Sequence, residues 1–522
     1  MGVIFCCDFL KVECASVGKS CSMITARVPL IKNKLDEGII NLKKEVVILI
    51  AIVILVVIIY GFIDWRGKTE DRETEPKINQ EQETGIQSLY VSPTGNDRND
   101  GSKEHPFQTL KKAADKAVAG TTVYIREGIY KEPLTVKHSG KKQLPIVFQA
   151  YDQEKVIISG VEMAEKEEET SLITIQNKNY VSIKGLIMED LSTSLADETV
   201  MGIYIAGSSS HIVIENNVVR KISTMNEDGN AHGIAVYGTE GMKNIVIRNN
   251  VVQDLKLGAS EALVLNGNID GFIIEGNTVR NNDNIGIDLI GYEGTGKKDD
   301  FTRNGIIKNN IVYNNSSFGN PAYGEDYSAA GIYVDGGKNI KVKANTVYLN
   351  DLGIEATSEH RKKYADNIEI THNIVYENVY TGISIGGYDE ERGGTTNTII
   401  AKNILYQNDT KGLEGGQLLL QYDTKKNTIQ QNIMTTSSSQ LFIVNEFQKN
   451  VDNRLVKNIY HKEENKQGRW IWKGEEYTDF IDFKEASNSD KQSMYIDPKY
   501  KNPLKHDFDL KPNSPVYDIL SE

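Results

Sequence analysis

The sequence contains almost no cysteine. All four cysteines lie within the first 21 of 522 residues, at positions 6, 7, 14 and 21. Residues 22–522 therefore hold no disulfide and no thiolate metal site. The chain also lacks the CxxC pair, the HExxH zinc motif and the phosphate-binding GxxxxGK[ST] loop. These absences argue against thiol-redox, zinc-protease and nucleoside-triphosphatase chemistry.

An excess of basic residues is missing as well. The chain has 72 acidic residues against 59 lysines and arginines, for a net charge of −13. Binding to nucleic acid requires a basic surface, so nucleic acid is excluded as a partner, and a strongly anionic polymer would be repelled unless another group offset the charge. At 522 residues the chain exceeds one ordinary compact domain, which predicts several domains or an elongated repeat.

Long apolar runs are scarce, and the clear one lies near the N-terminus. Residues 46–63 form an uncharged run of 18, long enough to span a bilayer. Five basic residues precede it and no small-residue cleavage site follows it, which predicts a retained membrane anchor with a cytoplasmic N-terminus. The basic residues are Arg27, Lys32, Lys34, Lys43 and Lys44. We therefore expect residues 1–45 in the cytoplasm, 64–87 as a flexible tether, and the rest outside the cell on the cell membrane.

From residue 170 onward, an asparagine followed by a short apolar or β-branched pair recurs every 27–35 residues. The eight positions are Asn217, Asn250, Asn277, Asn310, Asn345, Asn373, Asn403 and Asn432. Such a period is typical of stacked supersecondary units, and β-branched runs without helical periodicity favour coils of strands. The predicted fold class is therefore all-β, a single-stranded right-handed parallel β-helix with the asparagines as an internal amide ladder. A β-propeller is the alternative.

The repeat also divides the chain into regions. Residues 170–445 carry the repeat and are predicted to form the β-helix core. Residues 88–169 are expected to lead into it, with an amphipathic helix at 107–120 capping the open end, and residues 446–522 to form an irregular C-terminal cap.

A second phrase, which begins as GIYIAG at 202–207 and ends as GISIGG at 382–387, keeps the same spacing. We number the first position of the phrase zero. Positions one and three of the phrase are apolar and are predicted to face the core, so positions two and four face outward. The outward residues on three consecutive coils are Asp288, Tyr333, Asp335 and Glu355, and the same columns hold Tyr237 and Asn266. A purely structural surface avoids stacked acids, because they repel each other. We therefore predict a functional site with perturbed pKa values; a solvated charged surface is the alternative.

Two long excursions flank these coils, at residues 291–305 and 314–330. Long loops beside a rigid sheet commonly form the walls of a cleft, and Tyr292, Tyr323 and Tyr327 could serve there as platforms for sugar rings. Glu359, His360 and Arg361 follow the Glu355 strand and join Tyr237, Asn266, Asp288, Tyr292 and Tyr333 as candidate substrate-binding residues. A single tyrosine is more often plain packing, and a turn of solvated charges is the alternative interpretation for Glu359, His360 and Arg361.

Two stretches resemble known families. Residues 88–130 resemble the opening segment of extracellular β-helix carbohydrate enzymes. GIYVDGG followed by NDLGIEATSEH (331–360) resembles the strand pair of the β-helical β-xylosidases of glycoside hydrolase family 120. This resemblance implies that Asp335 is the nucleophile and Glu355 the acid/base, with no metal or other cofactor. The departures are a shorter turn, no tryptophan beside Asp335, and SEH where an HG-type turn is usual.

A rival resemblance points to elimination. NNDNIGIDLIG (281–291) is similar to the calcium-binding strand of the pectate lyases of polysaccharide lyase family nine, where Asp288 matches one calcium ligand. Asn284 and Ile285 stand in place of the companion aspartates, and Tyr333 in place of the catalytic lysine, so a lyase would need Tyr333, with His360, as its base.

The favoured prediction is a membrane-anchored enzyme that hydrolyses glycosidic bonds of a poly- or oligosaccharide with retention. A polysaccharide lyase that uses Ca²⁺ and a non-catalytic glycan-binding surface protein are the alternatives.

Overall fold

A computed structural model describes residues 86–163, 169–462 and 467–520 of the chain. All of these belong to one compact unit, Gln82–Glu522. The apolar run 46–63, the four cysteines and most of the expected tether lie outside the described residues, so the membrane anchor stays a prediction. Within the described ranges, no helix combines the length and apolar character needed to cross a bilayer.

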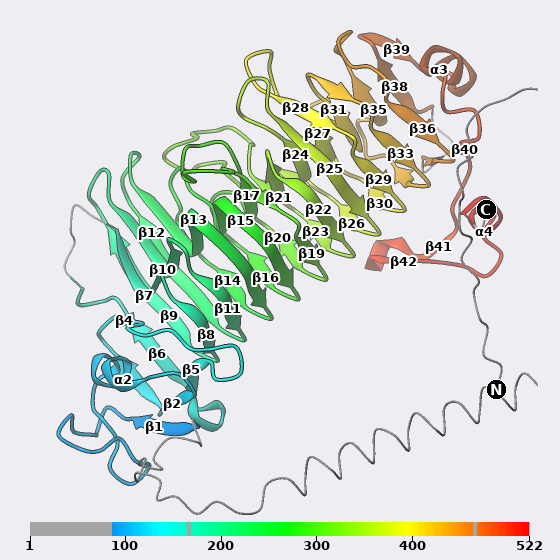
Figure 1. The fold of residues 1–522 in the computed structure, drawn as a ribbon. Coiled ribbons are helices and arrows are strands. Elements are labelled where there is room, and N and C mark those ends of the chain that lie inside the picture. The colour runs from blue at the N-terminus through cyan, green and yellow to red at the C-terminus, as the bar shows by residue number, and fades with distance from the viewer. Residues whose placement is uncertain (1–85, 164–168, 463–466, 521–522) are drawn as a thin grey trace, which may run out of the picture. The chain divides into compact units, whose positions relative to one another are not determined.

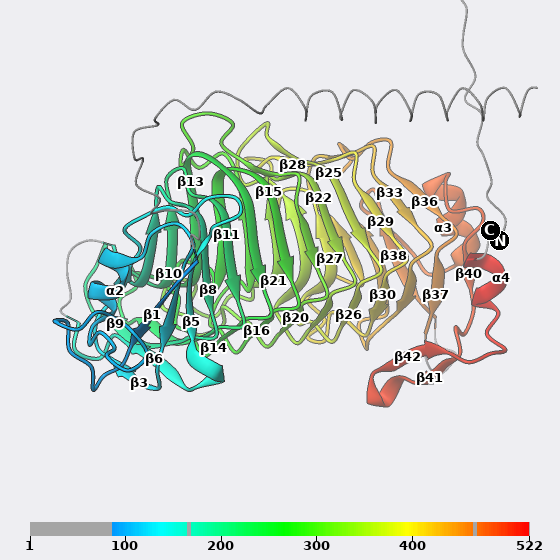
Figure 2. The same cartoon turned by 60° about the horizontal axis from the view of Figure 1, so that its bottom comes forward.

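The described chain forms a parallel β-helix (Figure 1). Each coil contributes strands that pair in parallel with the matching strands of the coils before and after it, as when β21 (Ala330–Asp335) pairs with β24 (Leu352–Thr357) and β24 with β27 (Thr381–Ile385). Figure 2 shows the coils stacked one behind another from β1 (Gln87–Val91) to β38 (Arg469–Trp472). The predicted all-β coil fold is confirmed, and a propeller is excluded because its blades are antiparallel.

The strands fall into three columns. The first column carries the predicted acids and consists of β7 (Thr170–Gln176), β10 (Thr199–Ala206), the first half of β13 (Asn230–Arg248), the first half of β15 (Leu263–Glu275), β17 (Ile287–Ile290), β21, β24, β27, β31 (Leu418–Leu420), β35 (Leu441–Asn445) and β38. The second column consists of β5 (Ile146–Ala150), β8 (Asn179–Lys184), β11 (Ser210–Glu215), the second halves of β13 and β15, β18 (Thr302–Arg303), β19 (Ile306–Lys308), β22 (Lys338–Lys343), β25 (Tyr364–Thr371), β28 (Gly394–Thr396), β29 (Ile399–Ala401), β32 (Thr424–Lys425), β33 (Thr428–Gln430) and β36 (Arg454–Val456).

The third column is a separate sheet. It consists of β3 (Gly128–Tyr130), β6 (Val156–Ser159), β9 (Ile187–Thr193), β12 (Val218–Thr224), β14 (Val251–Gln253), β16 (Thr278–Arg280), β20 (Ile311–Tyr313), β23 (Thr346–Tyr348), β26 (Ile374–Tyr376), β30 (Ile404–Tyr406), β34 (Ile433–Thr435), β37 (Ile459–His461) and β40 (Met494–Tyr495). Two turns of each coil carry asparagines: the turn that enters the third column and the turn that leaves it for the first column. These asparagines lie inside the coil, so their hydrogen bonds must be made within the protein.

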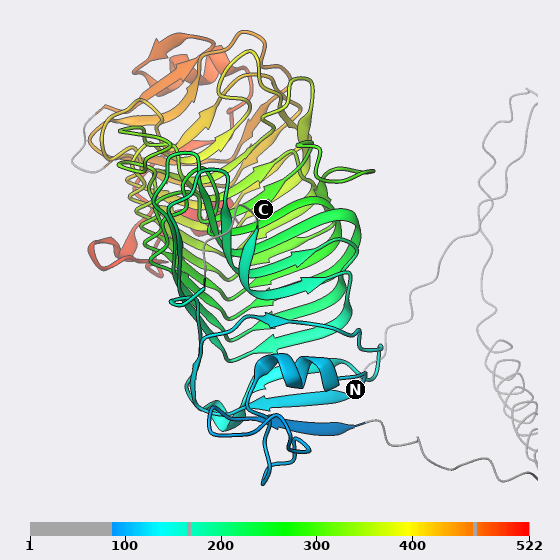
Figure 3. The ribbon, with the colours of Figure 1, turned by 90° about the vertical axis from the view of Figure 1, so that its left-hand side faces the viewer.

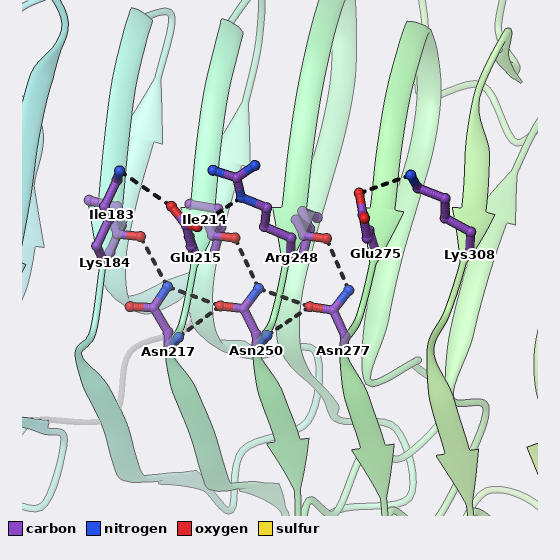
Figure 4. Close-up of polar contacts among 11 residues, drawn as sticks. Ile183, Lys184, Ile214, Glu215, Asn217, Arg248, Asn250, Glu275, Asn277 and Lys308 are labelled. Carbon is purple, nitrogen blue, oxygen red and sulfur yellow. Dashed lines mark hydrogen bonds and ion pairs between the residues drawn. The ribbon is translucent and has the colours of Figure 1, made fainter. Parts of the chain in front are cut away.

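An asparagine ladder satisfies these groups (Figure 4). Asn250 Nδ2 donates to the Ile214 carbonyl oxygen at 2.9 Å and to Asn277 Oδ1 at 3.0 Å, while its own Oδ1 accepts from Asn217 Nδ2 at 3.1 Å. The pattern repeats through all eight predicted asparagines and ends on Asn458. A second ladder, five residues further along each coil, joins Asn282, Asn315, Asn350, Asn378 and Asn408. On the outer surface, ion pairs such as Glu215 with Arg248 bridge the same coils.

The ends of the solenoid carry the few helices. α2 (Leu110–Lys116) lies inside the predicted range, begins at the N-cap Thr109, and packs against β1 and β4 (Leu134–Thr135), near β2 (Thr121–Ile125) (Figure 3). At the other end, α3 (Phe480–Ser487) buries Phe483 against Trp470 of β38, next to β39 (Glu475–Tyr477). The hairpin of β41 (Tyr500–Asn502) and β42 (Asp507–Leu510), followed by α4 (Val516–Leu520), packs Phe508 on Tyr376 and Tyr406. Parallel pairing therefore runs from β1 to β38, with hydrophobic packing closing both ends.

Candidate active site

The outward residues of the first column lie in the predicted register. Asp288 pairs with Tyr333, Tyr333 with Glu355, and Glu355 with Ser384, so these four form one column across four coils. Two residues further along the first-column strands, Tyr237 pairs with Asn266, and Asp335 with Thr357. Asp335 and Glu355 are therefore diagonal neighbours on adjacent strands.

This outer face is covered rather than solvated. Asp288 and Asp335 are each only 2% exposed and Glu355 is 7% exposed, which rules out an ordinary charged surface. Part of the cover is Tyr292, whose ring lies against Gly336, so closely that a Cβ there would be 2.8 Å from the ring. The Lys363 ammonium lies 4.9 Å from the centre of the same ring. The excursion that carries Tyr292 thus forms a wall of the site, as predicted for it.

Asp335 is held by one backbone group. Its Oδ1 accepts the N–H of Glu359 at 2.8 Å, and Glu359 Oε1 in turn accepts the hydroxyl of Tyr333 at 3.2 Å. Burial raises the pKa of Asp335 well above its usual range, and the charges of Glu359, Glu293 and Glu355 raise it further, while the backbone N–H opposes these effects. Asp335 Oδ2 makes no hydrogen bond within the described part of the chain, so it can meet a ligand.

Glu355 is held by two side chains from the following coils. Its Oε1 accepts from Ser384 Oγ at 3.2 Å and from Gln421 Nε2 at 3.0 Å. Burial, with a contribution from the charge of Glu359, raises the pKa of Glu355 to about 7. A carboxyl group with this pKa can both give and take a proton at neutral pH.

Asp288 is the least satisfied of the buried acids. Its Oδ1 is fully buried without a hydrogen-bond partner. Burial, followed by the charges of Glu261, Asp335 and Glu293, raises the pKa of Asp288 well above its usual range. Glu261 behaves in the same way, since burial and the charge of Glu293 raise its pKa to about 8. We refer to these acids together as the acid cluster, which consists of Glu261, Asp288, Glu293, Asp335, Glu355 and Glu359.

The acid cluster has few positive neighbours. Among residues 86–163, 169–462 and 467–520, the one basic side chain within ion-pair distance of the cluster is His232, whose Nδ1 lies 3.7 Å from Glu261 Oε2. His232 Nδ1 also lies 3.0 Å from the Glu261 carbonyl oxygen, which can only accept, so Nδ1 carries the proton and Nε2 accepts from the Tyr237 hydroxyl at 2.9 Å. Burial lowers the pKa of His232 to about 4, so this histidine is neutral at physiological pH.

Three members of this site were not predicted from the sequence. His232 and Glu261 each lie directly before the first residue of the recurring phrase, a position that strict alternation turns toward the core. The residue that follows this position is usually a glycine that lies very close to the next coil. A Cβ on Gly353, for example, would lie 2.3 Å from the carbonyl oxygen of Gly382, and the strict alternation does not continue through such a position. Glu293 lies in an irregular loop, so no periodicity points to it. The signal available for His232 and Glu261 is their shared position just before the phrase.

The remaining predicted residues lie at different distances from the acids. Asn266 Nδ2 donates to Glu293 Oε2 at 2.9 Å, which places Asn266 in the site. Arg361 points elsewhere, because its Nη1 pairs with exposed Glu391 at 3.2 Å.

Among the described residues, one group could hold a metal ion. Glu293, Asp335 and His360 each offer a ligand atom, and these atoms all lie within 4.8 Å of one another. Asp288 is not part of that group.

Comparison with known proteins finds a relative that matches most of the chain. It is 56% identical over 432 residues, 83% of this chain and 92% of the relative, to the uncharacterized protein YwoF of Bacillus subtilis (strain 168). The chain belongs to the YwoF family. Two family models also match, a Pel9A-like right-handed β-helix region at residues 89–282 and a right-handed β-helix region at 201–432. The predicted handedness of the YwoF-family coil is thereby confirmed.

More distant similarities are to named enzymes. The pectate lyase PEL9 of Emericella nidulans is 40% identical over 77 residues, which cover 14% of this chain and 19% of that enzyme. Among solved structures, a GH136 lacto-N-biosidase from Eubacterium ramulus matches with a TM-score of 0.45 and 14% identity, over 72% of this chain and 64% of that one.

Proposed function

We propose that this YwoF-family protein is an extracytoplasmic enzyme that hydrolyses glycosidic bonds with retention, using Asp335 and Glu355. The observation that carries the proposal is the pairing of two buried carboxyl groups on adjacent strands under a loop that carries tyrosine. Each carboxyl group has one oxygen fixed by protein donors and a second oxygen that makes no hydrogen bond among the described residues. A glycosidase pair needs this combination of fixed position and open reactivity.

The diagonal positions of the two residues are compatible with retention. Diagonal neighbours on adjacent strands have β-carbons about 7–8 Å apart, and side chains that lean together can bring the carboxyl groups to the roughly 5–5.5 Å of retaining enzymes. In the first step, Asp335 attacks the anomeric carbon and Glu355 protonates the departing oxygen. In the second step, Glu355 takes a proton from water, and this water displaces the sugar from Asp335.

The proton distribution within the acid cluster supports these roles. A nucleophile must be ionised, and among Asp288, Asp335 and Glu355 only Asp335 accepts a backbone N–H, a bond that favours the charged form. Asp288 has no hydrogen bond to stabilise a charge, and burial raises its pKa. The backbone N–H is therefore the contact that favours the ionised form of the proposed nucleophile, while the pKa of Glu355, raised by burial to about 7, suits it to supply the proton.

Product analysis tests the proposal. The full-length protein is incubated with neutral and uronate-containing glycans and the products are weighed. Hydrolysis adds one water per cleavage, and this is the result we expect. Binding without any product would instead favour a glycan-binding surface protein.

A second candidate function is calcium-dependent elimination. One observation favours it: the buried oxygens Asp288 Oδ1 and Asn284 Oδ1 both lack a partner, near Glu261, and unpaired oxygens of this kind suit calcium. The Pel9A-like family match and the pectate lyase relative agree with it. Against it, burial raises the pKa of Tyr333 well above its usual range, which makes Tyr333 a poor base. Unsaturated, ultraviolet-absorbing products that disappear on calcium chelation would select this function.

A further inference from the structure

We infer that Glu293, Asp335 and His360 bind a divalent transition-metal cation. Their ligand atoms lie within 4.8 Å of one another, although the residues come from three separate segments. Asp335 ends β21, Glu293 lies in the loop after β17, and His360 lies in the turn after β24. Metal–ligand bonds of about 2.0–2.2 Å would draw these atoms slightly closer together, and exposed Glu293 and partly exposed His360 have room to move.

A second observation, the unpaired amide oxygen of Asn266, points to a ligand at this place. Asn266 is only 5% exposed, and its amide lies against Glu293 because Nδ2 donates to Glu293 Oε2 at 2.9 Å. Its Oδ1 is buried without any hydrogen-bond partner. A buried amide oxygen left unpaired destabilises the folded protein, and a cation, or a water bound to that cation, would supply the missing partner.

The other ligand atoms are also available. Asp335 Oδ1 is occupied by the Glu359 N–H, but Oδ2 makes no hydrogen bond within the described ranges. Among the described residues, the hydrogen bonds of His360 involve only its backbone, whose N–H donates to Ser358 Oγ and whose carbonyl oxygen accepts from the Lys363 N–H. The imidazole of His360 and one oxygen of Asp335 can therefore turn to a metal without breaking an existing contact.

The ligand types select the class of metal. One imidazole nitrogen with two carboxylates suits zinc or manganese, whereas calcium and magnesium prefer sites built only from oxygen. This distinguishes the site from the oxygen-only positions around Asp288 and Asn284. We therefore expect Zn²⁺ and Mn²⁺ to bind more tightly than Ca²⁺ and Mg²⁺.

Metal binding and the proposed hydrolysis use the same atom. A cation bound to Asp335 takes the oxygen that would attack the sugar, so an occupied site blocks the nucleophile. The metal site does not depend on the proposed reaction, because binding can be measured without substrate.

Calorimetric titration of the metal-free full-length protein with each of the four chlorides tests the inference. We expect one equivalent of Zn²⁺ or Mn²⁺ to bind, at least tenfold tighter than Ca²⁺ or Mg²⁺. Loss of a hydrogen-bond partner of a metal ligand typically costs about 10–100-fold in affinity. Asn266→Ala should fall in that range, and the ligand variants His360→Ala and Glu293→Gln should lose at least as much.

Matched variants keep the test decisive. His105→Ala and Glu325→Gln remove an exposed histidine and an exposed glutamate elsewhere, and should bind metal like the unmodified protein. Bound metal should also raise the melting temperature of the unmodified protein but not that of His360→Ala. The same melting curves show whether each variant is folded. Failure of both metals to bind would overturn the inference. Binding that survives in His360→Ala and Glu293→Gln, or that is lost only in Asp288→Asn, would overturn it as well.

Discussion

The hydrogen bonds of single residues set the chemistry of the acid cluster. Asp335 has a backbone N–H from Glu359, which cannot rotate away, whereas Glu355 has a hydroxyl and an amide from Ser384 and Gln421. Both arrangements favour the charged form, but burial outweighs them: it raises the pKa of Asp335 well above its usual range and that of Glu355 to about 7. The different donors give the two neighbouring acids different environments, which is the condition for separate nucleophile and acid roles.

Removal of each carboxyl group should give a different defect. Asp335→Ala should abolish turnover on every substrate, because no covalent intermediate can form. Glu355→Ala should lose about 10²–10⁴-fold on natural glycosides, while aryl glycosides with good leaving groups should nearly retain the first step. Added azide should then restore turnover of Glu355→Ala, giving a glycosyl azide with the configuration of the substrate. The measurements are steady-state rates and product NMR.

Stereochemistry decides between the possible role assignments. Azide attack on the substrate in Asp335→Ala is a single displacement, so a product of opposite configuration fits removal of the nucleophile. An azide product of retained configuration from Asp335→Ala would reverse the roles. Unchanged rates in both variants would remove the pair from the mechanism and direct attention to Asp288 and Tyr333.

The pH dependence should report the Glu355 proton. A general acid works only while protonated, so kcat/KM should fall as pH rises through about 7. The Gln421 and Ser384 hydrogen bonds lower the pKa of Glu355, so Gln421→Leu should move the alkaline limb of the profile to higher pH. The exposed control Gln108→Leu should leave the limb in place. An unshifted limb in Gln421→Leu would mean that another group controls it.

At the scale of strands, the repeat made the register predictable. The spacing of the asparagines and the alternation of GIYVDGG were enough to place Asp288, Tyr333 and Glu355 in one column, because period-two alternation in a parallel ladder leaves no freedom. The same alternation failed at Glu261, which contacts His232 and the acid cluster instead of the core. Gln421 could not be found either, since it reaches Glu355 from 66 residues away, two coils later.

The asparagine ladder should be a large contributor to stability. Asn310 is only 1% exposed, donates to the Ile274 carbonyl oxygen and to Asn345 Oδ1, and accepts from Asn277. Asn310→Leu leaves these partners buried without hydrogen bonds, at a cost of about 3 kcal/mol or more in the free energy of unfolding. Guanidinium denaturation measures the change, and exposed Asn513→Leu is the control. A loss for Asn310→Leu no greater than that of the control would show that the ladder is not needed.

At the scale of the whole molecule, the buried acids should make stability fall with rising pH. Folding raises the pKa of Glu355 from 4.5 to about 7 and that of Glu261 from 4.5 to about 8, with Glu293 and Glu359 as charged neighbours. The folded state therefore binds protons more tightly than the unfolded state, and this stability is present below about pH 4.5 and lost as pH rises to about 8. For Glu355 the shift corresponds to on the order of 3 kcal/mol.

Thermal melts between pH 5 and 8.5 measure this effect. The melting temperature should fall across the range, and Glu261→Gln, which cannot ionise, should flatten the fall. Exposed Glu325→Gln should keep the full slope. A melting temperature that rises with pH would show that these acids are ionised in the folded protein.

The sequence predicts that residues 46–63 anchor the chain at the cell surface. The apolar run 46–63 is preceded by basic residues and followed by the predicted tether, residues 64–87. We expect protease added to intact cells to cut within the predicted tether and release the β-helix, because densely paired coils resist cleavage. Immunoblots should show an N-terminal epitope still attached to the cells and the C-terminal epitope in the medium, while a cytoplasmic marker stays intact. Protection of the C-terminal epitope in intact cells, with cleavage only after lysis, would place the β-helix inside the cell and contradict the predicted orientation.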